Sequence, residues 1–399
     1  MKTWMACLLF ASWSLAYGQT PDDVQNASKQ AEAKIDNALV EMLGVDIPPD
    51  LQKAADQGDA DAQEKIGEFY DRGTTEIPQD YAKAMVWYKK AAARGNVKAE
   101  CNLGTMYWLG EGVREDDVQA LAWDMKAAEQ GNAEAQVEVA RWYDRGSKGI
   151  PKDVIKAMDW YKKAAAQGNT TAECILGSIY FWGGDVPKDI SQGINWYKQA
   201  ATGGDGIAQS FLGETYEYGI GVPKDYAQAM EWYKKAAVQD VPQAQTYLGH
   251  MYEKGEGVPK DAAQAFEWYK KGAESDYGGA QYFLGRLYET GNGVPQDYYQ
   301  AMSWYRKAAD KGEPYSQCSV GRLYEKGESV PQDFGQAMLW YKKAADQNDA
   351  DAENALGSMY AKGEGVPQDS AEAQKWYDKA AAQKKKNEAA VAAAQAAMK

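Results

Sequence analysis

The chain has few of the residue types that build metal centres and nucleophilic active sites. Its 399 residues include one histidine and four cysteines, and neither Cys-x-x-Cys nor His-Glu-x-x-His occurs. The histidine, His250, cannot form a His-rich metal site, and a catalytic triad would need a nucleophile and an acid held beside it. A phosphate loop is also missing, because Gly-x-Gly-Val recurs between two expected helices and not after a strand. We therefore expect no enzyme activity, no cofactor and no metal, and a His250 that faces solvent or a partner.

An excess of positive charge is absent as well. Lys and Arg number 44 against 58 Asp and Glu, which gives a formal net charge of −14. Binding to a nucleic-acid backbone needs clustered Lys and Arg, so the composition argues against a nucleic-acid partner. Net acidity mainly keeps a protein soluble. No stretch reaches the roughly 18 apolar residues that a membrane-spanning helix needs.

Residues 1–18 have the pattern of an export signal. Lys2 supplies the positive start, residues 4–15 form an apolar run, and residues 16–18 (Ala-Tyr-Gly) form a small-residue cleavage site. The alternative is an uncleaved N-terminal anchor. We expect an exported protein of a periplasm-like or extracellular space, with no membrane insertion after the signal is cleaved.

What the chain has in quantity is one repeated segment. A tryptophan recurs every 36 residues, with a single step of 37. A constant step of this size is typical of stacked helical repeats. The pattern is helical, without runs of alternating β-branched residues, and 45% hydrophobic residues suffice for a core. A half-repeat begins at Leu51, and nine full repeats follow from about residue 61 to residue 383. The tryptophans are Trp87, Trp123, Trp160, Trp196, Trp232, Trp268, Trp304, Trp340 and Trp376.

Each repeat predicts two helices joined by a turn. In repeat six, Leu248, Gly249 and Tyr252 share a stripe on the first helix. A mid-helix glycine costs about 1 kcal/mol in helix propensity, so its recurrence indicates that two helices approach closely there. Gly255 and Gly257 are expected to end this helix, because glycine adopts the positive φ angles that the turn requires.

An aspartate precedes the second helix of every repeat. Gln or Glu follows three residues later in seven of the nine repeats, which is an Asp-led variant of the capping box. We therefore interpret these carboxylates as helix caps and not as catalytic groups. Trp268 and Tyr269 then share a face of the second helix with alanines, where large and small side chains interlock. The nine aspartates are Asp80, Asp116, Asp153, Asp189, Asp225, Asp261, Asp297, Asp333 and Asp369.

Three cysteines remain beyond the export signal. Cys101, Cys174 and Cys318 each lie three residues before the mid-helix glycine, in repeats two, four and eight. These repeats do not touch in a linear stack, and a disulfide needs Cα atoms within about 7 Å of each other. We expect three free thiols and no intramolecular disulfide, with an intermolecular bond as the alternative.

The repeat Ala-x-x-Gln-x-x-Leu-Gly-x-x-Tyr-x-x-Gly-x-Gly-Val-Pro-x-Asp-x-x-x-Ala-x-x-Trp-Tyr-x-x-Ala-Ala-x-x-Gly resembles the Sel1-like repeat, a relative of the tetratricopeptide repeat. The resemblance covers about residues 51–383. It implies an all-α fold, an α/α solenoid forming a right-handed superhelix whose first helices line the concave side. Residues 19–50 would form an N-terminal capping segment. The Ala- and Lys-rich tail, residues 384–399, would be a capping helix or a frayed end.

The same resemblance implies a scaffold or adaptor that mediates protein–protein or peptide interactions, in the cell envelope or with a host. Some exported relatives are stapled by one disulfide per repeat and bind penicillins. This chain lacks that cysteine pairing, and a β-lactam or cell-wall hydrolase stays an alternative by family analogy alone. A purely structural repeat protein is the third possibility.

If the superhelix is similar to its tetratricopeptide relatives, four positions of each first helix line the concave face: −3, +1, +4 and +5 from the glycine. Most repeats place charged residues there, whereas repeats two, four and five place aromatic ones. Grouped, partly exposed aromatic side chains mark interaction sites. The alternative is that they pack against loops of the next repeat. The predicted binding patch comprises Trp108, Leu109, Phe181, Trp182 and Tyr218, with Arg141 and Arg145 of repeat three between them.

Overall fold

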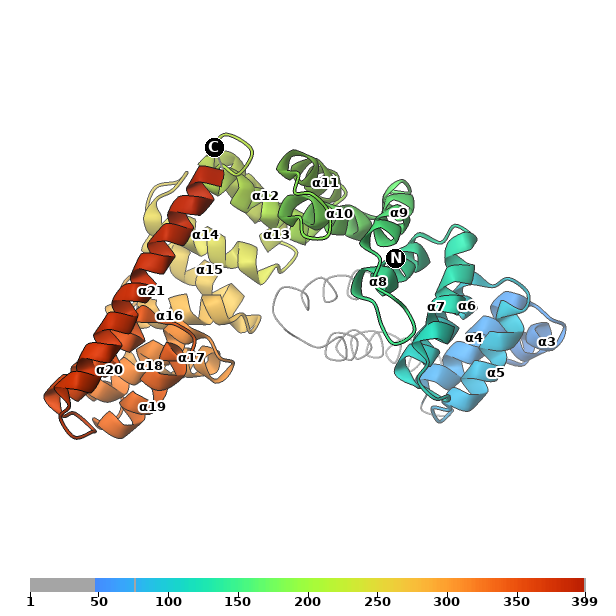
Figure 1. Ribbon diagram of the computed structural model, residues 1–399. Coiled ribbons are helices and arrows are strands. Elements are labelled where there is room, and N and C mark those ends of the chain that lie inside the picture. The colour runs from blue at the N-terminus through green and yellow to red at the C-terminus, as the bar shows by residue number, and fades with distance from the viewer. Residues whose placement is uncertain (1–46, 75–76, 398–399) are drawn as a thin grey trace. The chain divides into compact units, whose positions relative to one another are not determined.

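The computed structural model describes residues 47–74 and 77–397, and the regular elements found there are nineteen helices, α3 to α21 (Figure 1). The expected all-α fold is confirmed. The chain divides into two compact units, residues 1–207 and 208–399, and each is described by itself. The expected export signal and nearly all of the expected N-terminal cap lie outside the described residues.

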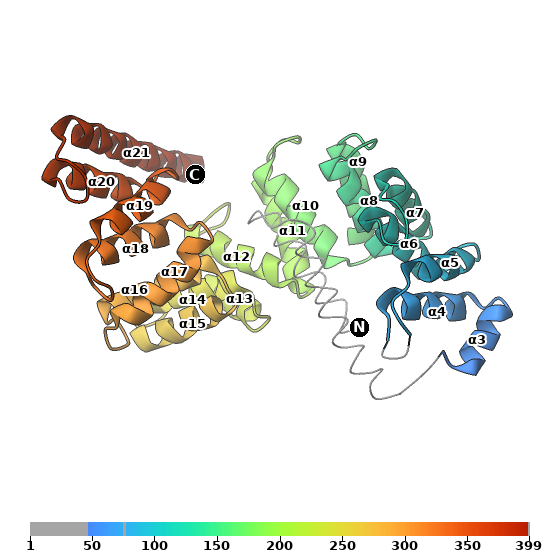
Figure 2. The same ribbon diagram turned by 90° about the horizontal axis from the view of Figure 1, so that it is seen from below.

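Each repeat folds as a helical hairpin, and successive hairpins pack on one another in chain order within each compact unit (Figure 2). The helices of the first compact unit are α3 (Pro49–Asp56), α4 (Ala60–Arg72), α5 (Tyr81–Ala92), α6 (Val97–Leu109), α7 (Asp117–Glu129), α8 (Ala133–Arg145), α9 (Val154–Ala165), α10 (Thr170–Trp182) and α11 (Ile190–Thr202). Here α3 is the half-repeat, and α4 with α5 forms repeat one.

The second compact unit holds the remaining helices, of which α12 begins two residues before its boundary. They are α12 (Gly206–Tyr218), α13 (Tyr226–Ala237), α14 (Pro242–Lys254), α15 (Ala262–Glu274), α16 (Gly278–Thr290), α17 (Tyr298–Asp310), α18 (Pro314–Lys326), α19 (Phe334–Ala345), α20 (Ala350–Lys362) and α21 (Ser370–Ala397). Repeat nine ends in α21, which packs on α20 and continues through residue 397, so the tail extends the last helix. Among the described residues, no helix combines the length and the apolar character that crossing a membrane requires.

A glycine and a tyrosine meet at the centre of most hairpins. A Cβ atom added at Gly249 would lie 2.7 Å from Cδ1 of Tyr269, so any larger residue would overlap the ring. The expected close approach of the two helices is confirmed. The tyrosines at this position are the largest fully buried side chains of the described core: Tyr88, Tyr161, Tyr197, Tyr233, Tyr269, Tyr305 and Tyr341.

The neighbouring tryptophan has a different role from the tyrosine. Trp268 is half-buried, and Nζ of Lys271, one helical turn later, lies 4.3 Å from its ring centroid. Such a cation–π contact shields the ring from water while the lysine head stays solvated. Both aromatic residues were expected to share one packing role, whereas in the structure the tyrosine forms the core and most of these tryptophans lie at its edge. Equivalent lysines cover Trp87, Trp123, Trp160, Trp232, Trp304, Trp340 and Trp376.

The predicted helix caps are confirmed in all nine repeats. In α15, Oδ1 of Asp261 accepts hydrogen bonds from the backbone N–H groups of Ala263 and Gln264, both at 3.0 Å. The turn glycines Gly255 and Gly257 have φ angles of 77° and 72°, as the turn requires. The other eight aspartates accept equivalent backbone hydrogen bonds.

The three described cysteines are free thiols, as expected. Burial is the largest cause that raises their pKa values: to about 12 for Cys101, and above the ordinary value for Cys174 and Cys318. Because the thiolate is the reactive form of cysteine, these three groups are poor nucleophiles at neutral pH.

Candidate interaction surface in repeats two to four

In repeats six, seven and eight, the residue four positions after the glycine is a glutamate held by contacts inside the fold. Glu253 of α14 accepts a hydrogen bond from the Tyr269 hydroxyl at 2.8 Å and forms an ion pair with Arg286 of the next repeat at 2.6 Å. Tyr305, Glu289 and Arg322 repeat this arrangement one step later. The acids at this position are therefore committed to internal contacts and are not free to bind a partner.

Repeat four replaces that acid with Phe181. In this repeat the hydroxyl groups of Tyr197 and Ser178 form a hydrogen bond of 2.9 Å. Phe181 packs its ring against Tyr197, with centroids 6.0 Å apart, and only 4% of its surface is exposed. The predicted patch included Phe181 as a partly exposed residue; the structure corrects this, because the ring fills space beside the tyrosine.

Trp182, the last residue of α10, lies next to the buried Phe181 and is exposed to solvent. It is 62% exposed, and its ring lies edge-on to that of Phe181, with centroids 5.0 Å apart. An exposed aromatic side chain that already packs against a buried ring is restrained before binding, so it loses little conformational freedom when a partner covers it. Trp182 thus has the geometry of an anchor residue.

Repeat two departs from the pattern in another way, because Asp124 stands where the other repeats have the core tyrosine. Its carboxylate lies against Gly104 and accepts a hydrogen bond from Nε1 of Trp142 at 2.8 Å. Trp142 belongs to α8 of repeat three, and its ring contacts Trp108 of α6 edge-on, with centroids 6.3 Å apart. Two half-buried tryptophans therefore converge over a buried carboxyl group, within the first compact unit.

The electrostatics of this site are those of a carboxyl group removed from water. The pKa of Asp124 is raised to about 8, mainly by burial; the Trp142 hydrogen bond opposes this rise, and the charge of Glu138 adds to it. Cys101 lies nearby, and after burial the charge of Asp124 is the largest cause of its raised pKa. Strongly perturbed acids cluster at functional sites, although here the neighbouring thiol is too weakly acidic to act as a nucleophile.

The other predicted residues occupy varied surroundings. Leu109, the last residue of α6, is half-buried. Arg141 of α8 forms an ion pair of 2.5 Å with Glu138 on its own helix, and Arg145 is exposed at the end of α8. Tyr218 belongs to the second compact unit, where it is 49% exposed. The structure therefore brings together two aromatic pairs, Trp108 with Trp142 and Phe181 with Trp182.

Sequence reasoning missed Asp124 and Trp142. The signal for Asp124 is present, because Trp123 is followed by Asp where the other eight repeats have Tyr. That substitution removes a ring from the core and leaves space for another side chain. Trp142 could be found only by asking which nearby residue fills that space.

Comparison with known proteins identifies the family of this repeat. The model of the Sel1 repeat matches ten segments: residues 44–59, 60–96, 97–132, 133–169, 170–205, 206–240, 242–277, 279–313, 314–349 and 350–385. A protective antigen present in uropathogenic Escherichia coli strains, which displays an SLR fold, is 32% identical and superimposes with a TM-score of 0.66 over 84% of this chain and 79% of its own. A Sel1 repeat protein from Oxalobacter formigenes is also 32% identical, with a TM-score of 0.62 over 78% of this chain and 90% of its own. The chain belongs to the Sel1 repeat family and is an α/α solenoid.

Proposed function

We propose that the chain is an exported scaffold that binds a protein or peptide partner of the cell envelope or of a host through α6, α8 and α10. Sel1 repeats generally serve as surfaces for protein interaction. The export part of the proposal rests on the pattern of residues 1–18. The observation that carries the binding part is Trp182, an exposed tryptophan fixed on a buried phenylalanine.

The contribution of Trp182 to the binding free energy can be estimated from the apolar surface that a partner would bury. Tryptophan buries up to about 250 Å² of surface, and apolar burial stabilises by roughly 25 cal/mol per Å². Covering the exposed part of Trp182 would therefore contribute about 2–4 kcal/mol to binding. Tryptophan and arginine are enriched among the residues that dominate interface energies, and Arg145 supplies an exposed cation on α8.

The Trp108–Trp142 pair lies in the same compact unit and is the second aromatic pair of the proposed surface. Both rings are half-buried, so a partner would meet their edges and not whole faces. The carboxyl group of Asp124 beneath them holds Trp142 in place through the indole N–H. We propose binding and not catalysis, because this surface has a buried thiol of raised pKa and no histidine.

Replacing Trp182 by Ala is expected to weaken partner binding at least tenfold while the melting temperature changes by less than about 2 °C. The side chain is mostly in solvent, so its removal creates no internal cavity. Crosslinking in intact cells followed by mass spectrometry identifies the partner, and pull-down with purified full-length variants measures the loss.

Tyr299→Ala on α17 is the matched control, because Tyr299 is an even more exposed aromatic residue, at 74%, outside the proposed surface. It should bind the partner as the unaltered chain does. A fall in melting temperature for Trp182→Ala as large as that of a core substitution would show that Trp182 is structural. Equal partner capture by both variants would also contradict the proposed surface.

A further inference from the structure

His250 occupies a position that two later repeats give to arginine. Arg286 and Arg322 stand immediately after the repeat glycine, and each forms an ion pair with the glutamate 33 residues earlier, at 2.6 and 2.7 Å. The same spacing of 33 residues pairs His250 of repeat six with Glu217 of repeat five. The second compact unit therefore has a histidine at the position where its next two repeats have an arginine.

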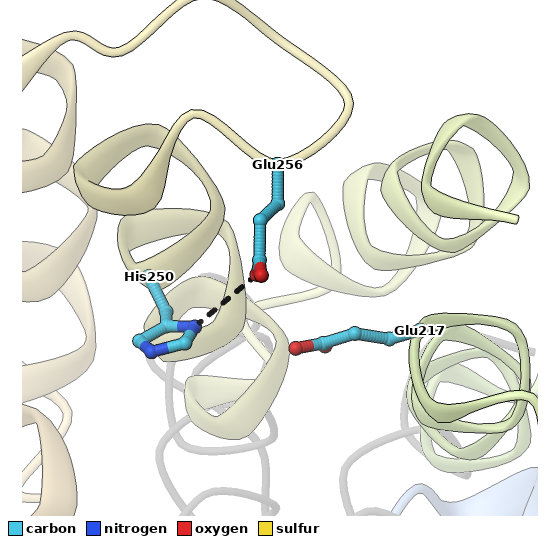
Figure 3. A group of neighbouring side chains, drawn as sticks. All are labelled: Glu217, His250 and Glu256. Carbon is cyan, nitrogen blue, oxygen red and sulfur yellow. Dashed lines mark ion pairs between the residues drawn. The ribbon is translucent and has the colours of Figure 1, made fainter. Parts of the chain in front are cut away.

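A third side chain completes this group. Glu256 follows α14 in the turn, and its Oε2 lies 3.9 Å from Nδ1 of His250. Figure 3 shows the carboxylates of Glu217 and Glu256 and the imidazole of His250 pointing toward a common point, from α12, the turn and α14. One donor atom from each residue lies within 4.8 Å of the other two.

Each of the two carboxylates accepts a hydrogen bond from a tyrosine hydroxyl. The Tyr233 hydroxyl donates to Oε2 of Glu217 at 2.6 Å, and the Tyr226 hydroxyl donates to Oε1 of Glu256 at 2.8 Å. Glu217 is 2% exposed, so its orientation is set by the fold and not by solvent. Hydrogen bonds from neighbouring side chains orient carboxylate ligands of metal ions in proteins.

We propose that Glu217, His250 and Glu256 form a binding site for a divalent transition-metal ion of the zinc type. One imidazole nitrogen and two carboxylate oxygens suit such an ion, and three protein ligands leave one position open for water or for a partner's side chain. Ligand bonds of about 2.0–2.2 Å place donor atoms roughly 3–4 Å apart. The present separations reach that range if the carboxylates move inward by about 1 Å, which rotations within a glutamate side chain allow.

The comparison with the arginine repeats favours an ion over a simple salt bridge. Arg286 contacts Glu253, the acid 33 residues earlier, at 2.6 Å, whereas Nδ1 of His250 lies 3.9 Å from Oε2 of Glu256, an acid in the turn after its own helix. That separation is too long for a hydrogen bond but suits two ligands of one metal. His250, which was expected to face solvent or a partner, is 30% exposed and lies beside the two acids.

Calorimetric titration of zinc into the metal-free full chain tests the proposal. We expect one equivalent of zinc to bind, with affinity at least tenfold lower in His250→Arg and in Glu256→Gln. His250→Arg restores the residue of the next two repeats and should keep the fold. Glu253→Gln is the matched control, because Glu253 is the repeat-six counterpart of Glu217 without a histidine partner, and it should bind zinc within twofold of the unaltered chain.

Cobalt in place of zinc gives a second readout, a visible absorption band that the unaltered chain shows and His250→Arg lacks. Zinc held by the free thiols would persist in His250→Arg. Saturable binding that is equal in the unaltered chain and His250→Arg, or no saturable binding at all, overturns the proposal. If circular dichroism shows His250→Arg to be misfolded, the comparison of Glu256→Gln with Glu253→Gln decides it.

Discussion

Replacing Tyr269 by Ala is expected to lower the free energy of unfolding by about 4 kcal/mol, because buried aromatic residues cost roughly 3–5 kcal/mol when truncated. Tyr269 is fully buried, packs against Gly249 and stacks on Phe283 with ring centroids 5.0 Å apart. Its removal also takes the hydroxyl donor from Glu253. Urea unfolding followed by circular dichroism measures the change.

Two further variants separate packing from hydrogen bonding at this position. Tyr269→Phe keeps the ring and should cost only about 1 kcal/mol, because Glu253 retains its ion pair with Arg286. Tyr299→Ala removes an exposed ring and should change stability by less than about 0.5 kcal/mol. A Tyr269→Ala variant no less stable than Tyr299→Ala would contradict the assignment of this tyrosine to the centre of the hairpin.

Replacing Asp124 by Asn is expected to remove a pH dependence of stability worth a few kcal/mol. The pKa of Asp124 is about 8 in the folded chain, against an ordinary value of 3.8. The folded state therefore keeps a proton that the unfolded state releases above pH 3.8. This contribution is fully present at low pH, decreases as the pH rises, by about 1.4 kcal/mol per unit, and is lost once the pH passes about 8.

The amide of the Asp124→Asn variant would carry no charge at any pH and would still accept the Trp142 hydrogen bond. The stability of this variant relative to the unaltered chain should therefore increase between about pH 4 and pH 8 and then level off. Glu64 and Glu214, whose pKa values burial raises to about 7, contribute equally to both proteins and cancel in the difference.

Asp225→Asn provides a control of opposite sign. The backbone N–H of Gln228 is the largest cause that lowers the pKa of this exposed cap, so its contribution is lost as the pH falls. Urea midpoints measured from about pH 2 to pH 9 give all three curves, with the Asp225 loss expected below about pH 4. Parallel curves for Asp124→Asn and the unaltered chain would show that Asp124 is not protonated in the folded state.

The repeat itself was predictable because its residues act locally. The Asp261 cap, the turn at Gly255 and Gly257, and the contact of Gly249 with the second helix each follow from chemistry within one hairpin. Nine copies of the pattern remove most ambiguity. The free thiols were predicted from the placement of the three cysteines in repeats that are not neighbours in the sequence, and the described thiols are unpaired.

The candidate sites were harder to predict because they depend on contacts between repeats. Phe181 and Trp182 are adjacent aromatic residues, and nothing in their spacing shows that the first is buried and the second exposed. The proximity of His250 to Glu217 follows from the 33-residue register that Glu253 and Arg286 share. Reading that register requires knowing which first-helix positions face the next hairpin, and the structure supplies this.

The variable positions of repeats two to four are proposed to bind a partner, while the repeat itself only holds them in place. Site-specific photocrosslinking in intact cells tests this claim most directly, with a photoreactive phenylalanine analogue at Trp182 in one protein and at Tyr299 in another. We expect a crosslinked partner from position 182 and none of that identity from position 299. Equal capture at both positions, or capture at position 299 alone, would contradict the claim.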